Sequence, residues 1–394
     1  MKKKQLFILL AVGLALILLY LWQQCSNREN WSGASLNAAG SSTILPESFN
    51  SENVSTVVLT KDGQTATLQK GDHNWTMAER YGYPVNFASL KTLFVDLFET
   101  KVAQTLTLDQ NQTAELQLTP DTGAVSMTML DKEGKQLIKL LFGKKHERET
   151  EMPPSPYGGG GNTPLGRFLQ INDRDFILAA NTFSRVDDTV VQWLDEEFFK
   201  ISDLKTASLK ENDTVLWETA RSDKNADLTL LGDMPPEQEL DSTKLASLKN
   251  AFSWVRFKDV ADPALPPEKV GLDKARTLLV TDFNDFIYTL TIPQPVEGKQ
   301  YLKIQVAWQG PLERTPAAEE KPEDKEKADA AFAQSVKEKQ DQAKELNARL
   351  SPWIYEVEAR VVENVNKERK YFLKDKPKPA EETKETKETK PAQN

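Results

Sequence analysis

The chain is poor in the residues that build disulfides and metal sites. Its 394 residues include one cysteine, Cys25, and two histidines, His73 and His146. A single cysteine excludes an intramolecular disulfide, and two histidines argue against a multi-histidine metal centre. Basic charge is also in deficit: the net charge of −9 argues against a nucleic-acid partner, which requires clustered lysine and arginine. We therefore predict no cofactor, no metal and no nucleic acid.

Only one long hydrophobic run is present, and it lies at the N-terminus. Three lysines follow Met1, and residues 6–22 are apolar without interruption, ending in Tyr20 and Trp22. As a helix this run would span roughly 25 Å, close to the ~30 Å hydrocarbon core of a bilayer. The lysines favour a cytoplasmic N-terminus, which places the following residues across the membrane.

Three interpretations of this run compete. A cleaved secretory signal requires small residues at a cleavage site, and the run instead ends in Tyr-Leu-Trp. A lipoprotein signal would need small residues before Cys25, whereas Gln23 and Gln24 are bulky. We therefore favour an uncleaved signal anchor at residues 1–25. It would be a single-pass transmembrane helix in a bacterial cytoplasmic (inner) membrane, with the body on the periplasmic, extracytoplasmic side. Residues 26–52, rich in Ser, Asn and Gly, are interpreted as a linker.

The body predicts an α+β fold made of two similar β-rich repeats, each with an amphipathic helix on an antiparallel sheet. The repeats cover residues 53–185 and 201–373, and Ser-Leu-Lys occurs in both, at 89–91 and 247–249. Apolar residues three and four apart predict a buried helical stripe in each copy: Leu90, Leu93, Phe94 and Leu97, then Leu245, Leu248, Phe252 and Val255. Asn86 and Ser242-Thr243 are the expected N-caps.

Three further segments interrupt or extend these repeats. Residues 186–200 carry apolar residues that predict a short bridging helix. A charged insertion at about 310–350 has the composition of a helix from about Lys325 onward. That helix could be a solvated projection or a docking element for a partner. Residues 374–394 repeat Glu-Thr-Lys among prolines and predict a disordered tail.

The body also resembles a known family. The stretch Val-Ser-Thr-Val-Val-Leu-Thr-Lys-Asp-Gly-Gln-Thr from Val54, then Trp75-Thr76 and Tyr83-Pro84-Val85 before the first helix, is similar to DUF4340 proteins over most of residues 50–310. Members are typically anchored, exported proteins of unassigned activity. They are often associated with ABC-type transport systems resembling the gliding-motility auxiliary components. The resemblance implies an accessory role at a transporter and supplies no catalytic residues.

Two patterns in the sequence could form a binding or catalytic site. Gly158 to Gly161 could suggest a phosphate cradle, but the run is not followed by the Gly-Lys-Ser/Thr of a P-loop, which favours a surface loop. Four aspartates lie close in sequence and raise the possibility of paired-carboxylate catalysis or cation binding: Asp173, Asp175, Asp187 and Asp188. The Asn-Asp-Arg-Asp segment between two apolar strands is also typical of a turn.

The histidines and tryptophans do not form a pattern typical of a catalytic or carbohydrate-binding site. His73 and His146 have no serine or cysteine in a nucleophile context, so we expect both at the surface. Tryptophans 75, 193, 217 and 254 lie within apolar patterns, which favours packing in the core over a carbohydrate platform. We therefore assign no catalytic, cofactor-binding or metal-binding residue.

Two function classes follow. The first is a non-enzymatic, membrane-anchored extracytoplasmic accessory or scaffold protein, associated with an ABC-type transport system and its permease complex. The alternative is an envelope enzyme or binding protein that acts on a glycan or lipid ligand. A deep pocket with convergent carboxylates or exposed tryptophans would favour the alternative.

Overall fold

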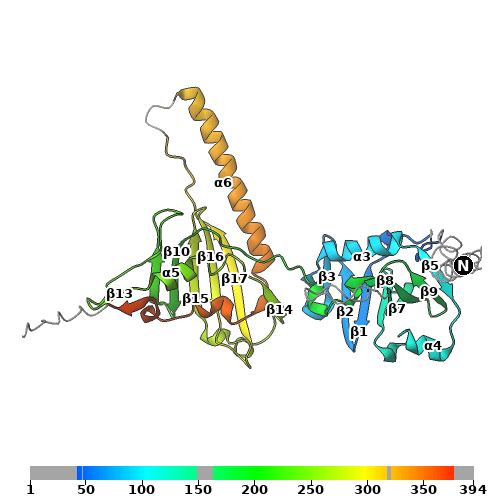
Figure 1. Cartoon of the computed structure of the whole chain (residues 1–394). Helices are drawn as coiled ribbons and strands as arrows, with labels where there is room; N and C mark the ends of the chain where they lie inside the picture. The colour runs from blue at the N-terminus through cyan, green and yellow to red at the C-terminus, as the bar shows by residue number, and fades with distance from the viewer. Residues whose placement is uncertain (1–41, 47, 149–162, 317–320, 377–394) are drawn as a thin grey trace, which may run out of the picture. The chain divides into compact units, whose positions relative to one another are not determined.

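A computed structural model describes residues 42–46, 48–148, 163–316 and 321–376. The fold is α+β, with large antiparallel sheets and few helices. The chain divides into two compact units, and the boundary falls between Glu196 and Glu197. Unit 1 precedes this boundary and unit 2 follows it, and Figure 1 shows the elements of both.

Unit 1 is built on a nine-stranded antiparallel sheet. The strand order is β4-β3-β2-β1-β6-β7-β8-β9-β5. The strands are β1 (Thr56–Lys61), β2 (Gln64–Lys70), β3 (Trp75–Met77), β4 (Tyr83–Pro84), β5 (Val102–Leu106), β6 (Val125–Leu130), β7 (Gln136–Arg148), β8 (Thr163–Ile171) and β9 (Asp175–Ala179). Its helices are α3 (Phe87–Glu99) and α4 (Gln110–Glu115), with 3₁₀ turns η1 (Ser51–Asn53), η2 (Ala78–Arg80), η3 (Pro120–Thr122), η4 (Ser184–Asp187) and η5 (Val190–Trp193).

Helix α3 covers one face of this sheet because it joins the two edge strands, β4 and β5. The side chain of Asn86 accepts a hydrogen bond from the backbone N–H of Ser89 at 3.0 Å, so the expected N-cap is confirmed. Leu90, Leu93 and Leu97 are almost fully buried. Period-2 alternation in β1 and β6 supplies the other side of this core: Val57, Leu59, Val125, Met127 and Met129.

Unit 2 has an eight-stranded antiparallel sheet in the order β12-β11-β10-β15-β16-β17-β18-β14. The strands are β10 (Leu204–Glu211), β11 (Thr214–Ala220), β12 (Thr229–Leu230), β14 (Phe257–Ala261), β15 (Arg276–Asp282), β16 (Phe286–Ile292), β17 (Gln300–Trp308) and β18 (Ile354–Val357). A separate pair joins β13 (Gln238–Leu240) to β19 (Leu373–Asp375). The helices are α5 (Ser242–Lys249), α6 (Pro322–Leu350) and α7 (Arg360–Glu363), with 3₁₀ turns η6 (Pro267–Lys269), η7 (Leu272–Lys274) and η8 (Arg369–Phe372).

Each unit ends with a segment that closes onto its own helix N-terminus. In unit 1 the backbone N–H of Asn86 donates to the carbonyl oxygen of Trp193 at 2.8 Å. In unit 2 the N–H of Asp241 donates to the carbonyl oxygen of Phe372 at 2.9 Å. Asp241 is also the N-cap of α5, because its carboxylate accepts from the N–H of Lys244; the expectation of a cap at Ser242-Thr243 was wrong by one residue.

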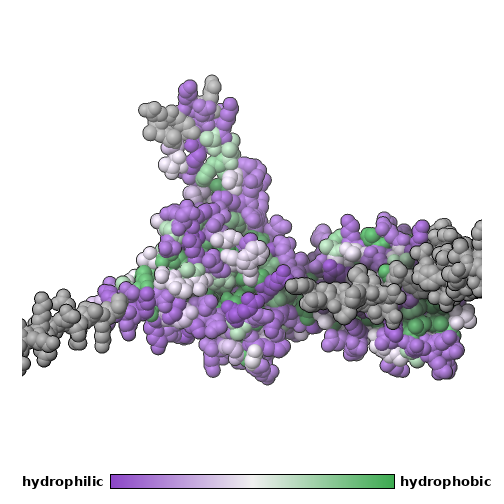
Figure 2. All heavy atoms as spheres, in the orientation of Figure 1, coloured by the Kyte–Doolittle hydropathy of each residue, from purple (hydrophilic) through white to green (hydrophobic). Residues whose placement is uncertain are grey.

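The charged insertion between β17 and β18 contains helix α6, which begins at Pro322. Its C-terminal part packs on β17: Ala343 and Leu350 are buried, and the side chain of Asn347 accepts from the N–H of Val306 at 2.9 Å. Its N-terminal part stands away from the sheet of unit 2, and hydrophilic side chains cover most of its visible surface (Figures 1 and 2). The helix therefore combines a packed base with a projecting arm.

Two sequence expectations require correction. Residues 186–200 do not form one bridging helix: the 3₁₀ turns η4 and η5 end at Asp187 and Trp193, and the backbone is extended after each, at Asp188 and Leu194. The carbonyl oxygen of Trp193 is used by Asn86, and Leu194 pairs with Val85, so strand-like bonds replace a helix here. The tail expected from residue 374 is ordered at its start, where β19 pairs with β13.

Residues 1–25, the expected anchor, lie outside the described residues, as do residues 377–394. Among the helices that the structure does describe, none combines the length and the apolar character required to cross a bilayer.

Asp282 is a buried carboxylate at the end of β15. Its Oδ1 accepts from the N–H groups of Asn284 and Phe286 at 2.8 and 2.9 Å. Burial raises the pKa of Asp282; these two hydrogen bonds oppose the rise, and the charges of Asp285 and Asp203 add to it. Above the ordinary aspartate pKa, the unfolded chain releases this proton more readily than the folded one. Asp282 therefore lowers the free energy of unfolding as pH rises from the ordinary aspartate pKa of the unfolded chain to the raised pKa of the folded chain.

We expect Asp282→Asn to keep both acceptor bonds and to raise the urea midpoint at pH 7 relative to the original chain. The difference should disappear below the ordinary aspartate pKa, where both side chains are neutral. Asp213→Asn, at an exposed turn position, is the matched control. If Asp282→Asn instead lowers the urea midpoint by the same amount at pH 7 and at low pH, the charge of Asp282 does not destabilise the folded chain.

Candidate functional site

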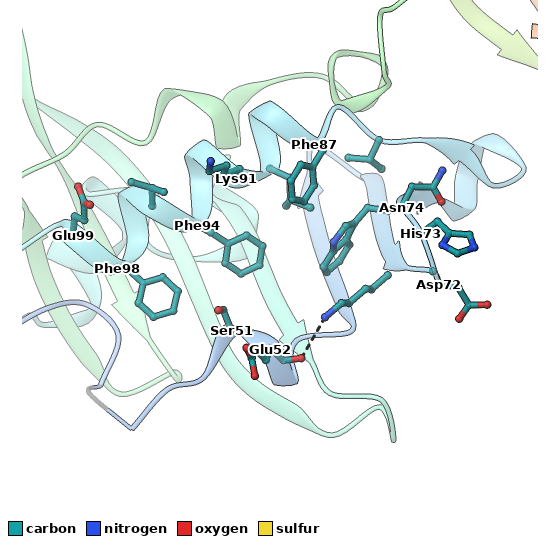
Figure 3. A pocket seen from close by; sticks show the side chains of 16 residues that line it. Ser51, Glu52, Asp72, His73, Asn74, Phe87, Lys91, Phe94, Phe98 and Glu99 are labelled. Atoms are coloured by element: carbon teal, nitrogen blue, oxygen red, sulfur yellow. Dashed lines mark hydrogen bonds between the residues drawn. The ribbon is translucent and has the colours of Figure 1, made fainter. Parts of the chain in front are cut away.

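A groove of about 770 Å³ lies in unit 1. It opens between α3 and the turns that precede β1 and β3 (Figure 3). Phe94 and Phe98 project from α3 toward Ser51 and Glu52 of η1, and Phe87 lines the groove at the N-terminal end of α3. Trp75 and Leu90 also line the groove, and both are mostly buried. Its lining is therefore aromatic and aliphatic.

The groove exists because α3 carries two apolar stripes. One stripe, Leu90, Leu93 and Leu97, faces the sheet. Phe87, Phe94 and Phe98 are spaced by seven and four residues, which places them on a common second stripe. Phe87 is 60% exposed, although phenylalanine is normally buried. Phe94 and Phe98 are half-buried, so the stripe is partly open to solvent, and apolar surface of this kind is typical of a binding site.

The opposite wall consists of two tight turns. The side chain of Asn50 caps η1 by accepting from the N–H of Glu52 at 2.9 Å. The turn between β2 and β3 is closed by the N–H of Gly71, which donates to the carbonyl oxygen of Asn74 at 2.8 Å. A Cβ at Gly71 would lie 3.0 Å from that oxygen, so glycine suits the turn.

Charged groups lie around this apolar lining. Both signs are represented, by Lys70 and Lys91 and by Glu52, Asp72 and Glu99. Lys70 Nζ donates to the backbone oxygen of Glu52 at 3.5 Å, which links the two turns of the wall. The arrangement is that of an apolar ligand site with a polar margin.

The four aspartates singled out in the sequence are not brought together. Asp173 lies in the β8–β9 turn, where it pairs with Lys139 at 3.0 Å. Asp187, in η4, instead accepts two hydrogen bonds from the buried guanidinium of Arg167, at 2.8 and 3.0 Å. Asp188 pairs with Arg185. Asp175 begins β9 and is exposed. Asp173, Asp187 and Asp188 thus pair with basic side chains and not with one another.

A smaller cavity of about 240 Å³ lies beside Asp187 and Trp193. Lys61 Nζ donates to the backbone oxygen of Asp187 at 3.0 Å, and Lys145 Nζ lies 2.8 Å from its Oδ2. Burial acts to raise the pKa of Asp187, but the hydrogen bonds and charges of Arg167 and Lys145 outweigh it and hold that pKa below its ordinary value. This cluster ties β7, β8 and η4 together.

The remaining sequence candidates scatter. His73 is exposed at the margin of the groove, while His146 is half-buried with its ring edge against Phe168. Cys25 and Gly158 to Gly161 lie outside the described residues. Within the described part of the chain, no group of three or more His, Cys, Asp or Glu side chains is placed to hold a metal ion.

The tryptophans divide between the core and the surface. Trp193 and Trp217 are 1% exposed, and Trp217 Nε1 donates to the carbonyl oxygen of Lys367 at 2.9 Å. Trp254 is 87% exposed, so its expected place in the core was wrong. It lies beyond the end of α5, where Lys200 Nζ stacks 4.5 Å from the ring centroid.

Sequence reasoning missed two parts of the groove. Phe94 was placed in the buried stripe, but it is half-buried and faces the groove. Residues 42–46 and 48–52, part of the stretch 26–52 interpreted as linker, are instead attached to the body: Ile44 and Leu45 are 4% and 2% exposed, and Thr43 pairs with Lys101. The apolar residues Ile44, Leu45 and Phe49 in an otherwise polar stretch were the available indication. We call the described residues 42–46 and 48–53 the lead-in segment.

These features define a two-unit α+β protein with an apolar groove on one helix. The chain belongs to the DUF4340 family, described as a domain of unknown function; the family profile matches residues 75–275, about half of the chain. No curated protein and no solved structure shows significant similarity to it.

Proposed function

We propose that this chain is a non-enzymatic accessory protein of a bacterial cytoplasmic membrane, held there by residues 1–25 with its body on the extracytoplasmic side. We propose further that it works beside an ABC-type transport system. The lysine-headed apolar run supports the location, and the resemblance to anchored DUF4340 proteins supports the partner. The observation that carries a binding role is the aromatic groove on α3, which has the size and lining of a ligand or docking site.

We also propose that the two units descend from one duplicated unit. Strand orders support this: β1 lies between β2 and β6 in one sheet, and β10 lies between β11 and β15 in the other. Beyond β6 the order is β7-β8-β9-β5, and beyond β15 it is β16-β17-β18-β14. The closing contacts, Asn86 to Trp193 and Asp241 to Phe372, join corresponding places in the two units.

The matching Ser-Leu-Lys triplets do not contribute to this argument. Ser89 is the third residue of α3, whereas Ser247 is the sixth residue of α5, so the triplets are out of register with the helices. Alignment on the N-caps instead sets Leu90 against Leu245 and Leu93 against Leu248, and all four are buried.

This alignment makes the groove specific to unit 1. The stripe formed by Phe87, Phe94 and Phe98 corresponds to Ser242, Lys249 and Ser253 in unit 2. Lys249 Nζ donates to the carbonyl oxygen of Ala226 at 3.2 Å and so covers the corresponding space. Since the fold tolerates polar residues at these positions, the aromatic residues of α3 are best explained by binding. The groove therefore favours the binding-protein alternative over the envelope-enzyme alternative, and a lipid over a glycan.

Affinity purification of the tagged full chain from membranes in mild detergents tests the accessory role. We expect permease and ATPase subunits of one ABC transporter to co-purify in fixed proportion. The control is a chain whose residues 1–25 are replaced by an unrelated transmembrane helix. It should retain the subunits, because the body makes the contact. Recovery of the chain alone in several mild detergents, or equal recovery of many unrelated membrane proteins, would contradict the proposal.

A further inference from the structure

The groove is built partly by the segment that connects the body to the N-terminal region. The carbonyl oxygen of Ser42 accepts a hydrogen bond from the N–H of Val102 at 3.0 Å, and the N–H of Ile44 donates to the carbonyl oxygen of Thr100. The lead-in segment therefore begins at the C-terminal end of α3. It then passes Phe98, whose ring centroid lies 5.8 Å from that of Phe49, and reaches Ser51 and Glu52 in the groove wall. One end of the groove thus coincides with the start of the described chain.

This connection limits how far the groove can lie from the membrane. If residues 1–25 are the anchor, 17 residue steps separate Cys25 from Ser42. Even fully extended, such a chain reaches only about 60 Å. A ligand confined to the membrane is then present at a high effective concentration near the groove, as for any tethered pair.

The lining indicates which ligand chemistry fits. A sugar requires several convergent hydrogen-bonding groups, and an extended peptide must pair its backbone N–H and C=O groups. The buried part of the lining is instead formed by apolar side chains, among them Trp75, Leu90 and the half-buried Phe94, and charged side chains also line the groove. An acyl chain needs no hydrogen bond along its length, so it matches the apolar part.

The margin indicates what lies at the end of that chain. Lys70 and Lys91 provide ammonium groups suited to a phosphate, and Glu52, Asp72 and Glu99 provide carboxylates suited to an amine. A margin of both signs complements a zwitterionic headgroup better than a purely anionic one. The volume of about 770 Å³ lies within the range of small-ligand sites.

We propose that the α3 groove binds an acyl chain of a zwitterionic membrane phospholipid from the leaflet next to the body. The proposal rests on the anchored location proposed above. Its consequence is that α3 faces the bilayer and holds unit 1 close to the lipid surface.

Fluorescence quenching by bromine-labelled lipids tests the proposal in the full chain, reconstituted in nanodiscs of phosphatidylethanolamine and phosphatidylcholine. The contribution of each tryptophan is obtained as the emission difference between the original chain and a single Trp→Phe variant. Trp22→Phe reports on the expected anchor, Trp75→Phe on the groove, and Trp217→Phe on the buried core of unit 2. Lipids brominated along the acyl chain are compared with unbrominated lipids.

We expect the Trp22 and Trp75 contributions to be strongly reduced by brominated lipid and the Trp217 contribution to be unchanged. Quenching of Trp22 without quenching of Trp75 would overturn the groove proposal and leave the anchor standing. If the chain does not incorporate into nanodiscs, or if Trp22 is not quenched, the anchored location itself fails. Equal quenching of Trp75 and Trp217 would indicate non-specific insertion of lipid and would also overturn the proposal.

Discussion

Replacing Arg167 with alanine is expected to lower the free energy of unfolding of unit 1 by about 3 kcal/mol or more, the usual cost of breaking a buried ion pair. The Arg167 side chain is 5% exposed. Besides its two bonds to Asp187, its Nε donates to the carbonyl oxygen of Gly143 at 2.9 Å, and its Nη1 donates to that of Thr182 at 3.3 Å. Removing it leaves a buried cavity and unpaired carbonyl oxygens.

The expected loss lies at the lower end of the range for buried pairs, because Lys145 would still pair with Asp187. Arg167→Lys should not restore stability, since an ammonium cannot form the two parallel bonds of a guanidinium. Urea unfolding followed by circular dichroism measures both variants. Arg185→Ala is the control: its side chain is 49% exposed and it pairs with Asp188, so we expect a loss below about 1 kcal/mol.

The effect of Arg167→Ala should also depend on pH. The folded-state pKa of Asp187 is lowered, so its contribution to stability is complete above the ordinary aspartate pKa and is lost as pH falls through the folded-state value. The difference between original and variant should therefore shrink in strong acid. It should not vanish, because the bonds to Gly143 and Thr182 do not titrate. A difference independent of pH would mean that the ion pair contributes little.

The sequence predicted the elements that depend on local patterning. The α3 stripe was visible because leucines recur at helical spacing, and Asn86 was recognisable as a cap. The β1–β2 hairpin also follows from local residues, since Asp-Gly is typical of a tight turn, and Asp62 and Gly63 adopt positive φ. The residues 186–200 were misassigned because their apolar residues serve long-range contacts, and nothing local indicates that Trp193 lies beneath the cap of α3.

The groove could not be predicted for a related reason. Helical periodicity identifies an apolar position but does not say which of two adjoining stripes faces the sheet, so Phe94 was grouped with Leu93. Part of the second wall comes from the lead-in segment, which is held by contacts with Phe98, Thr100 and Val102, about fifty residues away in the sequence. Trp254 shows the opposite error: its apolar neighbours Val255 and Phe252 are buried, and it is not.

The double variant Phe87→Ser, Phe94→Lys places in the groove the residues that unit 2 has at these two positions and is expected to lower the phospholipid-bound fraction strongly. Full burial of a phenylalanine side chain contributes about 1.5–3 kcal/mol. Phe87 is 60% exposed without ligand, so most of its contribution remains available for binding. We expect a combined loss of about 2 kcal/mol or more, which is about thirtyfold in affinity. Native mass spectrometry of the full chain in detergent measures the phospholipid-bound fraction.

The variant should remain folded because the substituted positions lie outside the leucine stripe, and α5 carries serine and lysine at the corresponding places. Val215→Ser is the matched control: it removes a 45% exposed apolar side chain from unit 2 and should leave the lipid-bound fraction unchanged. If the original chain, the double variant and Val215→Ser retain lipid equally, the lipid binds outside the groove. If the double variant loses lipid but also unfolds at a much lower urea concentration, Phe87→Ser alone replaces it. We still expect a severalfold loss of affinity, since Phe87 is the most exposed of the three phenylalanine rings of the groove.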